Sequence, residues 1–226
     1  RLFSITRSLT GDGNRKTFQI LQEIFPLEII EYPSGTPVYD WIVPDEWVIR
    51  DAYIKDSDGR RLVDFLECNL HLVSYSMSVH QQMTFDELAP RLHVLSGNPE
   101  AIPYRTSYYT RNWGFCLTGG QYEMLKNVSG LLEVCVDSDF KPNGAMTVGE
   151  VRVPGRSEEE YLVSTYCCHP SMANDNLSGL LTAAFLARDL LDGDTPFRSW
   201  RFVFVPETIG AIAYLHHNEA AMKKIQ

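Results

Sequence analysis

The segment from Tyr161 to the end of the chain constrains the fold most, because it alternates strand and helix patterns. Residues 161–167, Tyr-Leu-Val-Ser-Thr-Tyr-Cys, are typical of a buried strand, and residues 177–191 form an apolar helix pattern. Residues 201–205, Arg-Phe-Val-Phe-Val, predict a second buried strand, and a helical pattern follows from residue 209. This order is that of a parallel βαβα unit with a right-handed crossover. We therefore predict an α/β fold, with a mixed, largely parallel sheet flanked by helices.

The middle of the chain, from about residue 41 to residue 130, has a different texture. Aromatic residues are dense there, and short strand patterns such as 47–55 and 70–76 alternate with turns. The one helix pattern, residues 84–95, opens with a Thr84-x-x-Glu87 capping box. We predict that residues 41–130 form an inserted β-rich domain.

The flanking residues return to an α/β pattern. Residues 8–25 predict a loop that enters an amphipathic helix, and residues 27–32 predict a strand. Residues 131–137 and 146–153 resemble the two strands of a hairpin, with turn residues between them. The predicted core domain therefore consists of residues 1–40 and 131–226.

Charge and cysteine usage exclude several classes of protein. Acidic residues number 29 and basic residues 20, a net charge of −9, so the basic footprint of a nucleic-acid or anionic-membrane partner is absent. No apolar run approaches the roughly 20 residues that span a bilayer. The five cysteines form no CxxC pair and are too sparse for a disulfide-stapled domain, which favours a reduced, cytoplasmic protein. The chain begins with Arg1, so we expect a trimmed start or a fragment.

Polar residues follow both predicted buried strands of the βαβα segment. The first strand leads to His169 and Asp175, and the second leads to Glu207. Ligands bind at the carboxyl ends of the strands in such sheets, so these three side chains are expected to converge. An imidazole and a carboxylate suit Zn²⁺, and a neighbouring glutamate can act as general base. The alternative is ordinary packing at His169 and helix-start chemistry at Asp175 and its neighbours.

Several motifs resemble the M28-type zinc aminopeptidases and, more closely, a bacterial family of aminopeptidase-like proteins associated with polysaccharide biosynthesis and formerly of unknown function. The M28 likeness lies in His169, in Ala173-Asn-Asp-Asn-Leu-Ser-Gly179 and in Pro206-Glu-Thr-Ile-Gly210. The closer likeness covers nearly the whole chain. It rests on Thr6-Arg-Ser-Leu-Thr-Gly-Asp-Gly13, Asp40-Trp-Ile-Val-Pro44, Thr106-Ser-Tyr-Tyr109, Trp113-Gly-Phe-Cys116 and Cys168-His-Pro-Ser-Met-Ala173.

The resemblance implies roles for individual residues. His169 matches the first metal ligand, Asp175 the carboxylate that bridges two metals, and Glu207 the general base. Thr208 stands where M28 enzymes place a further metal-binding glutamate, and Ser171 stands where they place an aspartate that orients the histidine. The remaining ligands of such sites lie further along the chain, beyond residue 226. The resembling family is about twice as long, so we expect half of the fold and part of a site here. The missing glutamate at position 208 favours one Zn²⁺ over two.

Two functions of different class follow. The first is a zinc-dependent, aminopeptidase-like hydrolase that acts on a small peptide or another amide-containing substrate, in a polysaccharide biosynthesis pathway. The second is a catalytically inactive descendant that binds a partner protein or a glycan intermediate, which the departures at Thr208 and Ser171 favour.

Other polar residues receive ordinary interpretations. Cys168 and His169 are adjacent, and adjacent strand residues face opposite ways, which argues against a thiol nucleophile activated by that histidine. His216 and His217 are expected to be solvated. Arg7 belongs to a loop at the start of a helix, with binding of a substrate terminus as the alternative.

Overall fold

The computed structural model describes residues 1–226, and contacts within the chain divide it into two compact units. The first unit comprises residues 1–46 and 141–226, and the second comprises residues 47–140. The middle of the sequence is therefore a separate unit inserted between two parts of the other. No helix is both long and apolar enough to cross a bilayer.

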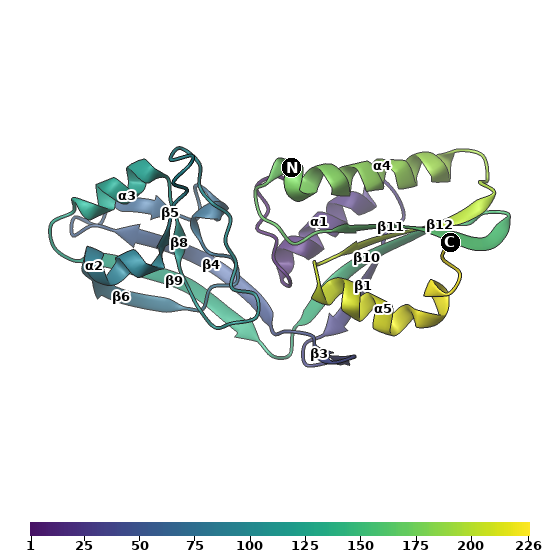
Figure 1. Ribbon diagram of the computed structural model, residues 1–226, viewed down its shortest axis with the longest axis horizontal. Coiled ribbons are helices and arrows are strands. Elements are labelled where there is room, and N and C mark those ends of the chain that lie inside the picture. Colours follow the sequence, from purple (N-terminus) through teal and green to yellow (C-terminus); the bar gives the residue numbers. More distant parts are fainter. The chain divides into compact units, whose positions relative to one another are not determined.

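A four-stranded sheet forms the centre of the first unit (Figure 1). Its strand order is β1 (Glu28–Pro33), β10 (Ala145–Val153), β12 (Arg198–Val205) and β11 (Ser157–Tyr166). The parallel pairing of β11 with β12 confirms the predicted βαβ unit. β12 is buried from Arg201 to Val205, as predicted, but β11 is the edge strand and its side chains are mostly exposed or half-buried, so the prediction that it is a buried strand is wrong. β10 runs antiparallel to both β1 and β12, so the sheet is mixed, and only one of its three pairings is parallel in this chain. The mixed α/β class is confirmed.

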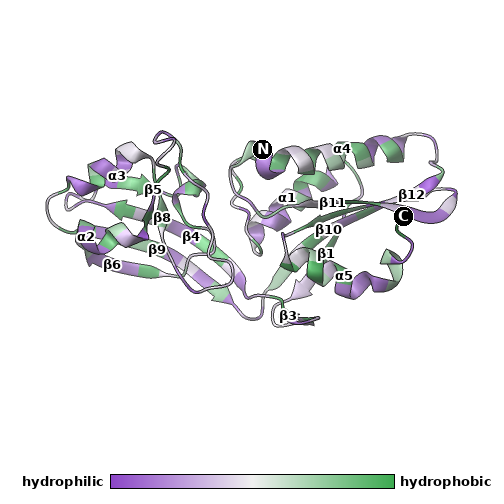
Figure 2. Cartoon of the chain, in the orientation of Figure 1, coloured by the Kyte–Doolittle hydropathy of each residue, from purple (hydrophilic) through white to green (hydrophobic).

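Helices cover both faces of this sheet. Figure 1 shows α1 (Asp12–Gln22) and α4 (Gly179–Asp192) on one face and α5 (Ile209–Met222) on the other. The face of the sheet under α1 and α4 holds an apolar core, and Figure 2 shows hydrophobic residues along the strands of this sheet. Its fully buried members include Phe18, Leu21, Cys167, Leu180, Ala184, Phe202 and Phe204. These residues are buried on both the helix side and the strand side of the interface. This burial explains the clear apolar runs in the sequence.

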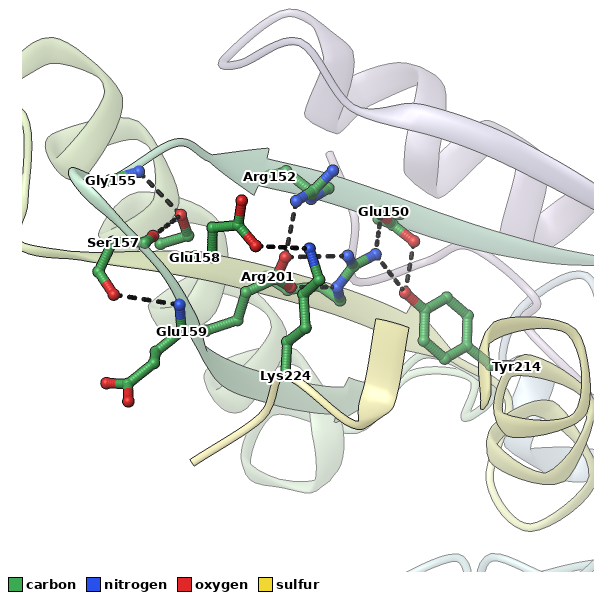
Figure 3. A network of polar contacts seen from close by, with 11 residues as sticks. Glu150, Arg152, Gly155, Ser157, Glu158, Glu159, Arg201, Tyr214 and Lys224 are labelled. Atoms are coloured by element: carbon green, nitrogen blue, oxygen red, sulfur yellow. Dashed lines mark hydrogen bonds and ion pairs between the residues drawn. The ribbon is translucent and has the colours of Figure 1, made fainter. Parts of the chain in front are cut away.

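The opposite face of the same strands carries a buried ion network (Figure 3). Side chains alternate along a strand, so Arg201 points away from the core that Phe202 enters. Arg201 donates to Glu160 at 2.7 Å and to Glu150 at 2.6 Å, and its side chain is 5% exposed. Tyr214 of α5 donates to Glu150 and accepts from Arg201 at 3.1 Å. The network therefore anchors α5 to three strands.

The second unit is built on the antiparallel sheet β5 (Arg61–Asp64), β4 (Glu46–Lys55), β9 (Leu132–Lys141) and β6 (Val79–Met83). The predicted strand 47–55 is confirmed as β4. The predicted hairpin is wrong: β9 pairs in this sheet, whereas β10 pairs with β1 and β12 in the first unit. Residues 132–140, which the sequence analysis placed with the core, thus belong to the sheet of the inserted unit.

Two further local predictions in the second unit are wrong. Residues 70–76 form no strand, because a 3₁₀ turn at Asn69–His71 is followed only by isolated bridges. The predicted helix 84–95 is reduced to α2 (Phe85–Leu88), a 3₁₀ turn at Ala89–Arg91 that contains a proline, and the short strand β7. The capping box at Thr84 is present with both hydrogen bonds. α3 (Gly119–Lys126) was not predicted.

Short strands complete the two units. β2 (Pro37–Val38) pairs with β3 (Trp41–Ile42) in the first unit, and β7 (Leu92–His93) pairs with β8 (Phe115–Cys116) in the second. The functional side chains considered below all belong to the first unit.

Candidate metal centre

His169 lies just beyond the carboxyl end of β11, on a loop that Arg7 holds in place. β11 ends at Tyr166, and the carbonyl of His169 accepts a 2.8 Å hydrogen bond from Nε of Arg7. Arg7 is fully buried, and this burial lowers the pKa of its guanidinium. Arg7 therefore positions the histidine loop from within the core, and no part of it is exposed to meet the terminus of a substrate.

The three residues predicted to converge do so around the imidazole of His169. Nδ1 lies 3.2 Å from Oδ1 of Asp175, and Nε2 lies 2.8 Å from Oε2 of Glu207. The imidazole is 6% exposed, whereas the side chains of Asp175 and Glu207 are 54% and 38% exposed. The histidine is thus fixed between two carboxylates that are open to solvent.

Different elements deliver these two carboxylates. Asp175 belongs to the irregular helical segment Ala173–Ser178, in which its backbone is not helical. Glu207 lies between the end of β12 and the start of α5. The residue after it, Thr208, adopts φ +57°, a conformation that is strained for a β-branched residue. The ends of two parallel neighbouring strands therefore bring together residues that are 38 positions apart.

Tyr166, the last residue of β11, also belongs to this region, and the sequence analysis missed it. Its ring meets the imidazole of His169 edge-on, with centroids 5.4 Å apart. A hydrogen bond with Asp175 raises the pKa of the Tyr166 hydroxyl. The available signal was its position at the end of the predicted strand, directly before the polar loop that carries His169.

Cys168 was also missed, and the reason given for setting it aside is wrong. The strand ends at Tyr166, so the alternation of neighbouring side chains does not apply to Cys168 and His169. Sγ of Cys168 lies 3.9 Å from Oε2 of Glu207 and accepts a 3.4 Å hydrogen bond from the Glu207 amide. Donor atoms of Cys168, His169 and Glu207 all lie within 4.8 Å of one another. Its neighbour Cys167 packs in the apolar core, where burial raises the pKa of its thiol to about 12.

Ser171 makes a different contact from the one expected of an orienting aspartate. Its hydroxyl donates to the carbonyl of Phe3 at 2.9 Å, and Asp175 occupies Nδ1 of His169 instead. Asn176, the residue after Asp175, is 5% exposed, and neither polar atom of its side chain has a hydrogen-bond partner. An unpaired buried amide beside the cluster is a costly arrangement that a bound ligand or water would relieve.

The exposed side of α5 lies outside this cluster. His216 and His217 are exposed, as predicted, although each packs against a tyrosine ring. A hollow of about 330 Å³ beside them is lined by Tyr39, Leu215, Glu219, Met222 and Lys223. None of these residues belongs to the His169 cluster.

Comparison with known proteins identifies the family. A family model described as a domain of unknown function, DUF4910, matches residues 1–226. The chain belongs to the DUF4910 family. A Clostridium acetobutylicum protein named "Putative polysaccharide biosynthesis protein with aminopeptidase-like domain" is 50% identical over 225 residues. The match covers 100% of this chain and 51% of that protein, so the chain spans about half the length of this relative.

Solved structures show the same fold. A putative peptidase from Clostridium acetobutylicum superposes with a TM-score of 0.95 at 50% identity, over 99% of this chain and 52% of its own. BSAP, a zinc aminopeptidase from Bacillus subtilis, gives a TM-score of 0.58 at 12% identity, over 100% and 65%. A peptidase M28 precursor from Shewanella amazonensis gives a TM-score of 0.54 at 12% identity. That match covers 99% of this chain and 66% of the precursor. The resemblance noted from the sequence is confirmed, and this DUF4910 chain has the zinc-aminopeptidase fold.

The residues of the DUF4910 cluster fit a transition metal such as zinc. One imidazole, two carboxylates and one thiol are the side chains that Zn²⁺ takes as ligands. The imidazole is buried and held between the two carboxylates, which are themselves partly exposed. The cluster is therefore closed by protein on one side and open to solvent on the other. Such a half-open arrangement is the one that a catalytic metal site needs.

Proposed function

We propose that this DUF4910 chain forms part of a zinc-dependent hydrolase of peptide or related amide bonds. The observation that carries the proposal is the imidazole of His169, which is buried between the carboxylates of Asp175 and Glu207 at the end of two parallel strands. The zinc-aminopeptidase fold supports the same class of reaction. The chain spans about half the length of these relatives, and the proposal assigns the chain only the part of the site that its own residues form.

Each residue has a distinct part in the proposed reaction. His169 and Asp175 would hold the metal, with Arg7 fixing the loop that carries the histidine. When bound, zinc polarises a carbonyl group and lowers the pKa of water in contact with it to about 7. The Glu207 carboxylate, which is 38% exposed, accepts a proton from the attacking water and returns it to the leaving amine.

The proposed substrate class rests on the type of reaction and on the name of a relative. We propose a small peptide or an amide-linked group on a sugar or lipid carrier, since the 50% identical relative is named for polysaccharide biosynthesis. Both Glu207 and Asp175 are partly exposed, so a substrate in solution can reach their carboxylates.

Replacement of Glu207 tests the proposal. In the full-length protein, Glu207→Gln should retain zinc and lose amide hydrolysis by about 100-fold or more, because the base is gone while His169 and Asp175 remain. Zinc is measured by elemental analysis, and hydrolysis is measured on a panel of aminoacyl and N-acyl amides. Glu158→Gln is the control, since Glu158 is 93% exposed and pairs only loosely with Lys224. Unchanged turnover in Glu207→Gln would contradict the assignment.

A second function, a binding module without catalysis, is supported by one observation. Thr208 cannot supply the carboxylate that M28 enzymes have at that position, and its strained backbone follows directly after Glu207. If the wild-type protein binds zinc and hydrolyses none of the amides, the binding module becomes the better function.

A further inference from the structure

We propose that Cys168 is a metal ligand of this chain, acting beside His169, so that the site contains a thiolate that zinc aminopeptidases of the M28 type do not use. The inference rests on the proposed function only in assuming that a metal binds at His169. It concerns how the metal is held and which metals are preferred.

The position of the Cys168 sulfur is the first argument. Sγ lies with Nε2 of His169 and a carboxylate oxygen of Glu207 in one group of donor atoms, all within 4.8 Å of one another. An ion of tetrahedral preference needs three or four donors around one point. This group places the sulfur of Cys168 and the imidazole of His169 around one point, with the proposed base Glu207 beside them. No comparable group involves Cys167, which faces the apolar core.

The hydrogen bonding of the sulfur is the second argument. The backbone N–H of Glu207 donates to Sγ of Cys168 at 3.4 Å. Groups that ligate metals are commonly held by such outer contacts, which orient them and stabilise their charge. The contact also ties the loop after β11 to the loop after β12, the two segments that deliver the donors.

The charge near the sulfur is the third argument. The buried guanidinium of Arg7 interacts electrostatically with Cys167 and with Cys168. Nη2 of Arg7 is buried without a hydrogen-bond partner, so its charge is not paired with a protein carboxylate. A cation close to Cys168 stabilises the negative sulfur that a metal-bound cysteine presents.

A cysteine ligand also accounts for the absence of a metal-binding carboxylate at position 208. M28 enzymes use a glutamate there, and Thr208 offers no carboxylate. Cys168 restores the count of protein donors from the neighbouring strand. A sulfur ligand makes the site softer, so it should prefer Zn²⁺, Co²⁺ or Cd²⁺ over Mg²⁺ and Mn²⁺. Coordination releases the thiol proton to the buffer.

Cobalt substitution tests the inference without reference to activity. The full-length protein, loaded with one Co²⁺, should show the near-ultraviolet charge-transfer absorption of a thiolate–cobalt bond. Cys168→Ser should abolish this absorption and weaken Zn²⁺ binding by about 10-fold or more, since even outer contacts of ligands are worth that much. Cys167→Ser makes the same chemical change at the adjacent buried cysteine and should retain the absorption.

X-ray absorption of the zinc-loaded wild-type protein provides a measurement that needs no variant. One sulfur should appear at about 2.3 Å from zinc, among nitrogen and oxygen neighbours. Bound metal with no thiolate band and no sulfur neighbour would overturn the role of Cys168, whether or not amides are hydrolysed. A thiolate band in a protein that hydrolyses no amide would support this inference and contradict the proposed function instead.

Discussion

Replacing Arg201 with methionine should destabilise the first unit by about 3–5 kcal/mol at neutral pH, because it leaves buried carboxylates without their main partner. Arg201 makes two hydrogen bonds to Glu160, at 2.7 and 3.3 Å, and one to Glu150 at 2.6 Å. The side chains of Glu160 and Glu150 are only 2% and 10% exposed, so water cannot replace the guanidinium. Methionine keeps the unbranched apolar stem of arginine but lacks the guanidinium, so the loss combines the missing charge with the space that the guanidinium filled.

The pH dependence of this loss follows from Glu160. Burial alone would raise the pKa of Glu160, but Arg201 and Arg152 outweigh burial and hold the pKa below its usual value of 4.5. A carboxylate with a lowered folded-state pKa stabilises the protein above 4.5, and this stability is lost as the pH falls through the folded-state pKa. Without Arg201 the pKa of Glu160 rises, so the variant loses the most stability relative to wild type at neutral pH. The difference in stability between wild type and variant should narrow as the pH falls through 4.5 and through the lowered pKa of wild-type Glu160.

Hydrogen exchange of β12 peptides, followed by mass spectrometry against urea, measures the stability of the first unit alone. Arg188→Met is the matched control, since its pair with Asp189 is exposed and should be worth less than about 1 kcal/mol. Adding Glu160→Gln to Arg201→Met should recover part of the loss, because it removes a stranded charge. A loss at neutral pH no larger than that of the control, or one that does not narrow with falling pH, would refute the reasoning.

Two further predictions concern local structure. Thr84→Ala should destabilise α2 by about 1 kcal/mol, because it removes the side chain that caps the helix, and hydrogen exchange of residues 85–88 should rise accordingly. Gly155→Ala should cost about 1–3 kcal/mol, since a Cβ there would lie 2.3 Å from the backbone of Arg198. Gly97→Ala meets nothing within 4 Å and should leave thermal unfolding unchanged, whereas equal melting temperatures for both glycine variants would contradict the second prediction.

The sequence predicted those parts of the fold whose contacts are local or periodic. The βαβα segment was recognisable because residues 201–205 of β12 are buried and α4 carries an apolar stripe. β11 has a similar apolar sequence, although it is the edge strand and its side chains are mostly exposed or half-buried. The convergence of His169 and Glu207 followed from the same pattern, since parallel neighbours end at one edge of a sheet. The capping box at Thr84 was predictable because it depends on four consecutive residues.

Features that depend on distant partners could not be predicted. β9 and β10 are separated by a turn motif, yet each pairs with strands far away in the sequence, and no local signal reveals that choice. Residues 71–76 are buried, but they make only isolated bridges, so the strand-like pattern there reflects burial and not a ladder. The placement of Cys168 required the point at which β11 ends, and strand ends are poorly specified by composition.

The two polar clusters of the first unit show why function is assigned to one of them. In the Arg201 network every charged group faces an opposite charge, and all the carboxylates are sealed from solvent, so a ligand has no group left to bind. In the His169 cluster two carboxylates crowd one imidazole, remain 38% and 54% exposed, and have the unpaired amide of Asn176 beside them. This cluster carries more negative charge than its neighbours neutralise. The proposal that a cation binds there follows from this excess of negative charge, and the thiol of Cys168 is the reason for proposing a transition metal over magnesium or calcium.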